Sequence, residues 1–491
     1  MQDYVGHLFY DVGAATIAAF VGKQHPTELT DEDLELVVDF VKREYIRQPL
    51  QSFLTVAFPN SGFTQPAYFN QPDKQKTYAQ RVLQSYTVDT PKSEELCVFT
   101  GQPAAAVAFD VNDKLPPGRA YRQHVPLITG EGTINFFPYG DVGLPISGEA
   151  LLAIQVLPLG CAKVGPRLLA VHSDNPEILY YFASTFLEQN RRQIQLAQAS
   201  NSSRLPELSL KHRTLMIETL LKTGIMQREA REDERPFSVT AYHLSNSGQG
   251  PALDIYELPM QVIGFLREME TPPFKDIWHA IVSRAWNRSS DSRITSGKAK
   301  KSEASYNLLY EDLFQLPERA DRFIRLYFLR SAWRDLANNA GPRGENALGQ
   351  DLRLVSWEIA ARFLRRILDM DSERIQQIRE MGSALATYVS QQHDRRFFRQ
   401  FYSVRRYDQL RILLIKASQA HVRQGNAPLI RLEPFIQVFE DGDELARVDW
   451  QLARDLVLIR MIEQLYELGW FKRHPEVIDD LDDTDESDNE H

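Results

Sequence analysis

Two runs of apolar residues at helical spacing constrain the C-terminal part of this chain more than any other feature. Apolar side chains recur at steps of three and four residues from Leu352 to Ile367 and again from Leu445 to Tyr466. This spacing places them along one face of an α-helix, which needs packing partners to leave water. We predict that residues 351–473 form a bundle of roughly four antiparallel helices, two of them between these runs.

The N-terminal region contains two further predicted helices. Thr30 and Asp33 resemble a capping box, and apolar residues follow them at helical spacing as far as Tyr45. A long helix is expected after Asn175, with Pro176 in its first turn.

Short apolar runs bounded by turn-forming residues predict strands. The runs 151–160 and 167–173 predict one pair, and the runs 237–245 and 252–259 predict another with a turn between them. Because strands and helices are mixed in this way, we predict an α+β fold for residues 1–340.

Two polar segments interrupt the apolar pattern. Residues 284–306 contain six basic and two acidic residues among Ser and Gly, so we expect an exposed basic loop that includes Lys298, Lys300 and Lys301. Such loops either contact phosphate groups or are solvated linkers, and the sequence leaves both interpretations open. Residues 338–351 are rich in Gly and Pro and separate the N-terminal region from the bundle.

The formal net charge of −10 is unevenly distributed. Residues 474–491 contain nine acidic residues and no Lys or Arg, so the rest of the chain has a net charge near −1. An acidic block of this kind is typical of a disordered tail. The negative total charge therefore does not exclude a nucleic-acid interface elsewhere on the chain.

Cysteine content and the N-terminal segment indicate the compartment. Cys97 and Cys161 are too few for a disulfide framework and fit a reducing cytosol. The apolar stretch 12–21 is shorter than a membrane span, and Asp3 and Asp11 stand where a signal peptide would carry positive charge. We expect a cytoplasmic protein without a signal peptide or membrane contact.

The densest basic cluster lies at residues 393–423, with eight Lys or Arg residues and two Asp residues. Phe397, Phe398, Phe401 and Tyr407 alternate with its arginines. On one continuous helix the guanidinium groups would share a side and follow phosphates, while exposed rings would stack on bases. The alternative is a solvated arginine face over aromatic core residues. The candidate DNA-binding residues of this cluster are Arg395, Arg396, Arg399, Arg405 and Arg406.

Enzymatic motifs are sparse. The segment around Lys298 lacks the upstream glycine and the Ser or Thr of a phosphate-binding loop. His393 and Asp394 form a pair found in metal phosphohydrolases, but such a site needs further ligands, and an acid in the first turn of a helix explains Asp394 better. A Cys97 nucleophile would need a histidine partner that spacing does not identify.

A zinc site would be equally incomplete. Cys97 and Cys161 with His124 or His172 lack the paired spacing of structural zinc sites. We therefore predict no bound metal, no cofactor and no enzymatic activity.

Several motifs of residues 5–185 occur in a fixed order. Gly6, His7, Asp11 and Gly13 form a Gly-His-x-x-x-Asp-x-Gly pattern, and FLTVAFPNSGFTQP follows it. CVFTG, NFFP, PISGEA and LLAIQVLPLGCAKVGPRLLAVHSDN then occur in sequence. In order and spacing these blocks resemble the large subunit of type I CRISPR interference complexes, in the CXXC-CXXC group of subtypes I-A and I-B.

The resemblance implies a zinc-ribbon-like element that has lost most of its cysteines. The family has two C-x-x-C knuckles, and three of their four cysteines are absent here. Thr100 stands where the second cysteine of the first knuckle would be, and residues 146–149 take the place of the second knuckle. A larger domain can replace the folding free energy of a metal by apolar packing. We expect the shape of the ribbon without its metal, with the Thr100 hydroxyl and nearby backbone groups bonding across the former site.

The resemblance also implies a function in Cascade, the RNA-guided surveillance complex of antiviral defence. The N-terminal region would read the protospacer-adjacent motif on duplex DNA, while guide RNA pairing reads the rest and the bundle stabilises the R-loop. Asn60 and Ser61 are the motif-reading candidates by their chemistry, with a role as turn formers as the alternative.

The implied partners are the other parts of such a complex. They are the backbone subunits, the subunit capping the guide 5′ end, double-stranded target DNA and the displaced single strand. The recruited effector is either a helicase-nuclease or a set of Tn7-like transposition proteins for RNA-guided transposition. Two other classes stay open: a metal-dependent nuclease using His393 and Asp394, and a protein-only scaffold whose basic surface binds acidic proteins.

Overall fold

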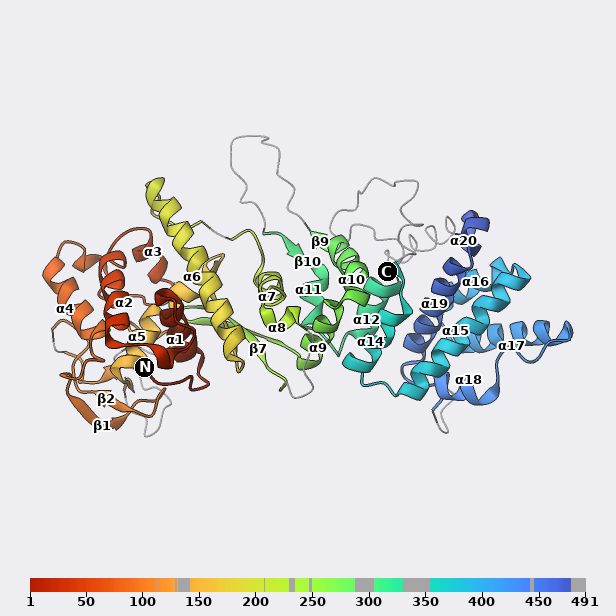
Figure 1. The fold of residues 1–491 in the computed structure, drawn as a ribbon, viewed down its shortest axis with the longest axis horizontal. Coiled ribbons are helices and arrows are strands. Elements are labelled where there is room, and N and C mark those ends of the chain that lie inside the picture. Colours follow the sequence, from red (N-terminus) through yellow and green to blue (C-terminus); the bar gives the residue numbers. More distant parts are fainter. Residues whose placement is uncertain are drawn as a thin grey trace. The chain divides into compact units, whose positions relative to one another are not determined.

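The computed structural model divides into two compact units (Figure 1). The N-terminal unit consists of Met1–Met260 with Arg288–Tyr306, and the C-terminal unit of Gln261–Asn287 with Asn307–His491. The main antiparallel sheet lies in the first and a group of helices forms most of the second, which confirms the predicted α+β class. The structure describes residues 1–112, 114–128, 130, 142–206, 208–228, 235–246, 250–287, 304–329, 354–441 and 446–477.

Helix α1 (Leu8–Val21) is the central helix of the N-terminal unit. Its residues from Phe9 to Ala18 are buried, because α5 (Gly148–Val156), α6 (Pro176–Ala199) and strand β6 (Arg167–Ser173) surround it. A Cβ atom on Gly13 would lie 2.0 Å from the carbonyl oxygen of Ala153, so only glycine permits this close packing of α1 on α5. None of the described helices has both the length and the apolar character that a membrane crossing requires.

Both helices predicted for the N-terminal region are confirmed. Helix α2 (Asp31–Glu44) begins with the expected capping box, in which the Thr30 hydroxyl accepts from the Asp33 amide at 3.3 Å and the Asp33 carboxylate accepts from the Thr30 amide at 3.0 Å. In α6, the Asn175 side chain accepts from the first free amides of the helix.

Short elements complete this unit. They are η1 (Pro26–Glu28), α3 (Leu50–Leu54), η2 (Pro66–Tyr68), α4 (Pro72–Leu83), β1 (Lys92–Leu96), β2 (Pro103–Ala105), β3 (Arg119–Ala120), β4 (Leu144–Pro145), η4 (Leu157–Gly160), α7 (His212–Leu220) and α8 (Gly224–Gln227). Strand β1 pairs with β2, and β3 pairs with β4.

The main sheet has the strand order β5-β6-β7-β8 and is antiparallel throughout. Its strands are β5 (Ala162–Val164), β6 (Arg167–Ser173), β7 (Val239–Ser245) and β8 (Ala252–Leu258). The strands predicted at 167–173, 237–245 and 252–259 are thereby confirmed.

The strand predicted at 151–160 is wrong, because these residues form α5 and η4. Ser147 caps the helix by accepting from the Ala150 amide at 3.3 Å. The run is almost entirely apolar and buried on all sides, so it lacks the alternation that distinguishes a strand from a buried helix.

Helices form most of the C-terminal unit. They are α9 (Met260–Met269), α10 (Pro272–Arg284), α11 (Leu308–Leu313), α12 (Ala320–Ile324), the π-helical turn η5 (Arg325–Leu329), α14 (Trp357–Ile367), α15 (Ser372–Gln392), α16 (Arg395–Ser403), α17 (Tyr407–Arg423), α18 (Leu432–Phe439), α19 (Trp450–Glu467) and α20 (Trp470–Arg473). Helices α15 and α19 lie side by side (Figure 1).

The division between the units falls earlier than the sequence indicated. We placed residues 1–340 in one region, but 261–287 and 307–329 pack with the C-terminal helices. The Phe363 ring of α14 lies 5.5 Å from the ring of Phe265 and 5.3 Å from that of Phe323, centroid to centroid. Local composition carries no signal for such contacts between distant segments.

Two other sequence predictions need correction. Four helices, α15 to α18, lie between α14 and α19, where we expected two. The ends of the predicted loop 284–306 are paired as β9 (Trp286–Asn287) and β10 (Tyr306–Asn307). Lys298, Lys300 and Lys301 lie outside the described residues, as do the break at 338–351 and the acidic tail beyond Val477.

Candidate nucleic-acid interface

The arginine cluster occupies two helices and the connection between them. The expected single helix is wrong, since α16 ends at Ser403 and Val404 adopts an extended conformation. Arg395, Arg396 and Arg399 lie on α16, whereas Arg405 and Arg406 lie in the connection that precedes α17.

The phenylalanines of the cluster belong to the core. Phe397, Phe398 and Phe401 are at most 4% exposed, and the ring of Phe398 contacts those of Trp470 and Phe471. These rings cannot stack on bases, so that expectation is wrong. The alternative interpretation, aromatic core residues beneath an arginine face, describes α16 correctly. The spacing had allowed both because the helix presents rings and guanidinium groups on opposite sides.

The connection between α16 and α17 is fastened to α19. The Arg454 guanidinium donates to the carbonyl oxygens of Tyr402 at 3.3 Å and Val404 at 2.6 Å. Arg454 is only 8% exposed and pairs at 2.6 Å with Asp455, which is 1% exposed. A buried charge that satisfies backbone carbonyls in this way fixes the backbone that carries Arg405 and Arg406.

Two arginines of the cluster pair with carboxylates of the chain itself. Arg395 contacts Glu476, and Arg406 lies 2.8 Å from Asp408. The two arginine side chains are 51% and 70% exposed, and ion pairs this accessible contribute little free energy. Neither ion pair therefore fixes its arginine side chain strongly.

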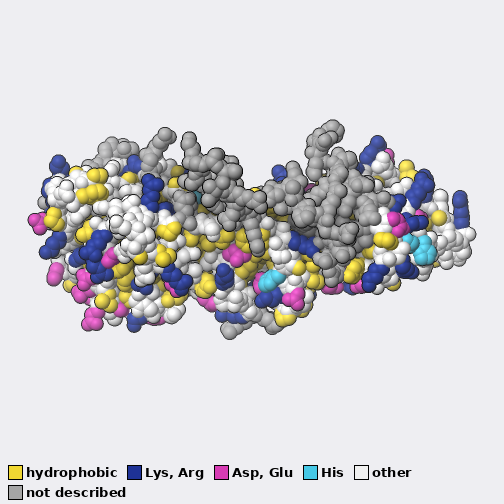
Figure 2. Space-filling model, turned by 90° about the horizontal axis from the view of Figure 1, so that it is seen from above, with side chains coloured by type: hydrophobic (Ala, Val, Ile, Leu, Met, Phe, Trp, Pro, Cys, Tyr) yellow, Lys and Arg dark blue, Asp and Glu magenta, His cyan; other side chains and the backbone are white. Residues whose placement is uncertain are grey.

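The remaining arginines differ in exposure. Arg396 and Arg405 are exposed, whereas Arg399 is partly buried. Figure 2 shows Lys and Arg side chains spread over the C-terminal helices at the right of the view.

A polar cavity of about 570 Å³ in the N-terminal unit contains one of the two predicted motif-reading residues. Asn60 is exposed at its edge and has a left-handed backbone with φ of 63°. Ser61 is fully buried, and its hydroxyl lies 3.1 Å from that of Thr64. Ser61 is thus a turn former and a wrong candidate for reading DNA, whereas Asn60 is exposed to solvent.

Residues of the segments 110–115 and 122–124, together with Tyr78 and Gly130, join the segment of Asn60 around this cavity. The polar part of its lining contains five amide or cationic side chains besides Asn60, and the carboxylate of Asp110: the five are Gln65, Asn112, Lys114, Arg122 and Gln123. The sequence predicted none of the five, since no spacing signal links them before the chain folds.

Asn246 holds the segments of the cavity together. Its side chain donates to the carbonyl oxygens of Ala57 at 3.2 Å and Arg122 at 3.3 Å, and its own carbonyl accepts from the Arg122 guanidinium at 2.6 Å. The Arg122 side chain is thereby held at the cavity wall. Beside it, burial lowers the pKa of His124 to about 4, so this ring is neutral at physiological pH.

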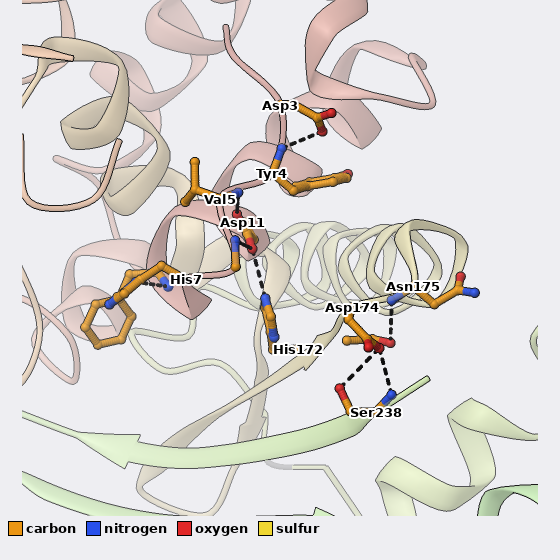
Figure 3. Close-up of polar contacts among 12 residues, drawn as sticks. Asp3, Tyr4, Val5, His7, Asp11, His172, Asp174, Asn175 and Ser238 are labelled. Carbon is orange, nitrogen blue, oxygen red and sulfur yellow. Dashed lines mark hydrogen bonds and ion pairs between the residues drawn. The ribbon is translucent and has the colours of Figure 1, made fainter. Parts of the chain in front are cut away.

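The Gly-His-x-x-x-Asp-x-Gly pattern performs a structural task (Figure 3). The buried Asp11 carboxylate accepts from the amides of Val5 at 2.8 Å and Gly6 at 2.9 Å, and lies 2.9 Å from His172 Nε2 of β6. His7 caps α1 by accepting from the Phe9 amide at 3.2 Å. The pattern thus ties the N-terminal segment and α1 to the main sheet.

The CVFTG turn and the segment that leads into α5 lie in contact. In CVFTG, the Gly101 amide donates to the Cys97 carbonyl at 2.9 Å in a tight turn. The Thr100 hydroxyl lies 3.2 Å from that of Ser147, and the Val98 amide donates to the Pro145 carbonyl at 3.1 Å. The hydrogen bonds that we expected between these two segments are therefore present. The NFFP segment lies outside the described residues.

The residues considered for metal chemistry have other partners. No three His, Cys, Asp or Glu side chains within the described ranges come together to hold an ion. Asp394 caps α16 by accepting from the Phe397 amide at 2.9 Å, and His393 ends α15 in a left-handed conformation. Cys161 is buried, which raises the pKa of its thiol.

Comparison with known proteins adds no relative. No protein-family model, curated protein or solved structure matches this chain. Its function must therefore be argued from its own residues.

Proposed function

We propose that this chain is the large subunit of a type I CRISPR RNA-guided complex and has no catalytic activity of its own. Its N-terminal unit reads a short duplex motif, and its C-terminal unit holds a separated DNA strand. Its partners are the backbone and guide-capping subunits, the guide RNA, target DNA, and either a helicase-nuclease or Tn7-like transposition proteins.

The observation that carries this proposal is the exposed arginine surface on a fixed backbone. Arg395, Arg396, Arg405 and Arg406 are exposed, and Arg454 holds the connection that carries the last two. Guanidinium groups bind phosphate through several hydrogen bonds, and a fixed backbone reduces the entropy lost on binding. These are the properties that a surface for a DNA strand requires.

The cavity at Asn60 supports the motif-reading part of the proposal. Amide side chains recognise adenine edges and guanidinium groups recognise guanine edges in the major groove. Asn60, Asn112, Gln65 and Arg122 bring both kinds of group to one cavity. The contact between Thr100 and Ser147 adds support, because it joins the two segments on which the family resemblance depends.

Binding of the purified full-length chain to labelled DNA tests the strand-holding role. The probe is a single strand of about 30 nucleotides, measured by fluorescence anisotropy at several salt concentrations. Replacing Arg395, Arg396, Arg405 and Arg406 with Ala is expected to weaken binding at least tenfold. The slope of log affinity against log salt should become shallower by about 0.7 for each phosphate that the variant no longer neutralises.

Arg43→Ala with Arg192→Ala is the matched control, because both side chains are exposed and lie on the N-terminal unit. Equal affinity of the arginine variant and the wild type would contradict the proposal. In the assembled complex, failure of R-loop formation with intact assembly supports DNA binding by these arginines, whereas failed assembly supports a protein-only scaffold. Cleavage of labelled DNA with Mg²⁺ or Mn²⁺ that His393→Ala abolishes would instead identify a nuclease.

A further inference from the structure

A groove of about 660 Å³ runs between α17 and α18 in the C-terminal unit. Its walls come from both helices and from the segment that joins them. The residues that line this α17–α18 groove include Leu414, Ile415, Val422, Pro428, Leu432 and Phe435.

The groove exposes an unusual amount of aliphatic surface. Ile415 is 48% exposed, Val422 is 47% exposed and Leu432 is 72% exposed. Ile415 and Val422 are two helical turns apart, so they form a stripe along α17 that lies beside its buried face. Single exposed apolar residues are ordinary, but a continuous group in a groove marks a contact surface.

Positive charge surrounds this apolar floor. Arg411, Arg423 and Arg431 line the groove and are exposed, against one glutamate, Glu440. The Glu440 carboxylate accepts from the Tyr407 hydroxyl at 2.8 Å and is therefore already engaged. An occupant that fits this groove is apolar along its centre and acidic along its edges.

We propose that the α17–α18 groove binds an amphipathic helix of a partner protein, with an aliphatic stripe flanked by Asp and Glu. A helix laid between two helices buries residues at steps of three and four, which matches the stripe on α17. A nucleic acid fits less well, because bases stack on exposed aromatic rings, whereas the exposed apolar residues of the groove are aliphatic and Phe435, the aromatic residue of its lining, is partly buried. The inference stands apart from the DNA-binding proposal, since it uses none of the arginines assigned there.

A designed peptide tests the groove in the full-length chain. The probe is a fluorescein-labelled helical peptide of about 18 residues, with Leu at steps of three and four and Glu beside them. We expect saturable binding, weakened at least tenfold by Ile415→Asp with Leu432→Asp. Leu36→Asp is the matched control, since Leu36 is 61% exposed on the N-terminal unit, and it should leave binding unchanged.

A charge swap makes the test specific. A peptide with Lys in place of Glu should bind at least tenfold more weakly, and Arg411→Glu with Arg423→Glu should reverse this preference. Equal binding of both peptides, or no effect of the groove variant, would overturn the proposal. Two further outcomes would also overturn it. In the first, the peptide does not bind the wild type, and the groove variant loses binding to single-stranded DNA. In the second, the peptide binds only after residues 478–491 are removed.

Discussion

The hydroxyl oxygens of Thr100 and Ser147 lie 3.2 Å apart, although 47 residues separate them in the chain. Ser147 also caps α5, so this contact joins the CVFTG turn to the start of a core helix. Hydroxyl and backbone hydrogen bonds hold the two segments together.

We expect Thr100→Val and Ser147→Ala to be coupled. Thr100→Val keeps the shape of the side chain and removes its hydrogen bonds to the Ser147 hydroxyl and the Gln102 amide, which should cost about 1 to 2 kcal/mol of unfolding free energy. Ser147→Ala also removes the helix cap and should cost about 1 to 2 kcal/mol. The double variant should lose less unfolding free energy than the two single variants lose together.

Urea unfolding followed by circular dichroism measures these free energies. All six tryptophans belong to the C-terminal unit, so tryptophan fluorescence should be unchanged and serves as an internal control. Strictly additive effects would show that the two hydroxyls do not interact.

Asp11→Ala should destabilise the N-terminal unit by about 3 kcal/mol or more, since it leaves two amides and the ring of His172 without their acceptor. Asp3→Ala is the control from the same segment, because the Asp3 side chain is 70% exposed. It should change stability by less than about 0.5 kcal/mol. Similar urea midpoints for the two variants would contradict the role assigned to Asp11.

Gly13→Ala and Gly264→Ala should act in opposite directions. A methyl group at Gly13 would overlap the backbone of Ala153, so we expect a loss of several kcal/mol or insoluble protein. Nothing lies within 4 Å of a Cβ atom at Gly264 on α9, where alanine should stabilise the helix by about 0.5 to 1 kcal/mol. Thermal unfolding compares them, and a stable Gly13→Ala variant would refute the close packing of α1 and α5.

His124 predicts how stability depends on pH. Its pKa is about 4 in the folded state and about 6.5 when unfolded, so the unfolded chain binds the extra proton. Its contribution of about 3 kcal/mol is complete above pH 6.5 and declines as the pH falls towards 4. His124→Phe keeps a ring beside Tyr78 and should lose less stability over this range than the wild type. Parallel pH profiles from urea unfolding would contradict this assignment.

Asn60→Gly and Ser61→Ala should separate DNA reading from folding. Glycine tolerates the left-handed backbone at residue 60, so Asn60→Gly should keep its stability while the assembled complex loses selectivity for its motif. Removing one base-reading side chain costs about 1 to 3 kcal/mol of discrimination. Ser61→Ala should instead lower stability and keep the selectivity. Binding to a randomised duplex library measures selectivity, and unaltered motif preference of Asn60→Gly would exclude Asn60 from reading.

Local sequence signals predicted the correct elements where the local chemistry is unambiguous. The capping box at Thr30, Pro176 at the start of a helix and the short apolar run 167–173 after Gly165 and Pro166 each encode their own structure. The prediction for the run 151–160 was wrong because a fully buried helix has no polar face. The division of the cluster at 393–423 into α16 and α17 was also missed, since it depends on Arg454 of α19.

The sequence alone determined the fold class, the starts of α2 and α6 and the concentration of arginines near the end of the chain, because capping, periodicity and charge act over a few residues. Tertiary structure alone decided which side chains meet. It brought Asn60 together with Arg122, buried Ser61 and the phenylalanines of α16, and joined Thr100 to Ser147. Those outcomes depend on packing between segments distant in the chain, and no local sequence pattern encodes the free energy of such contacts.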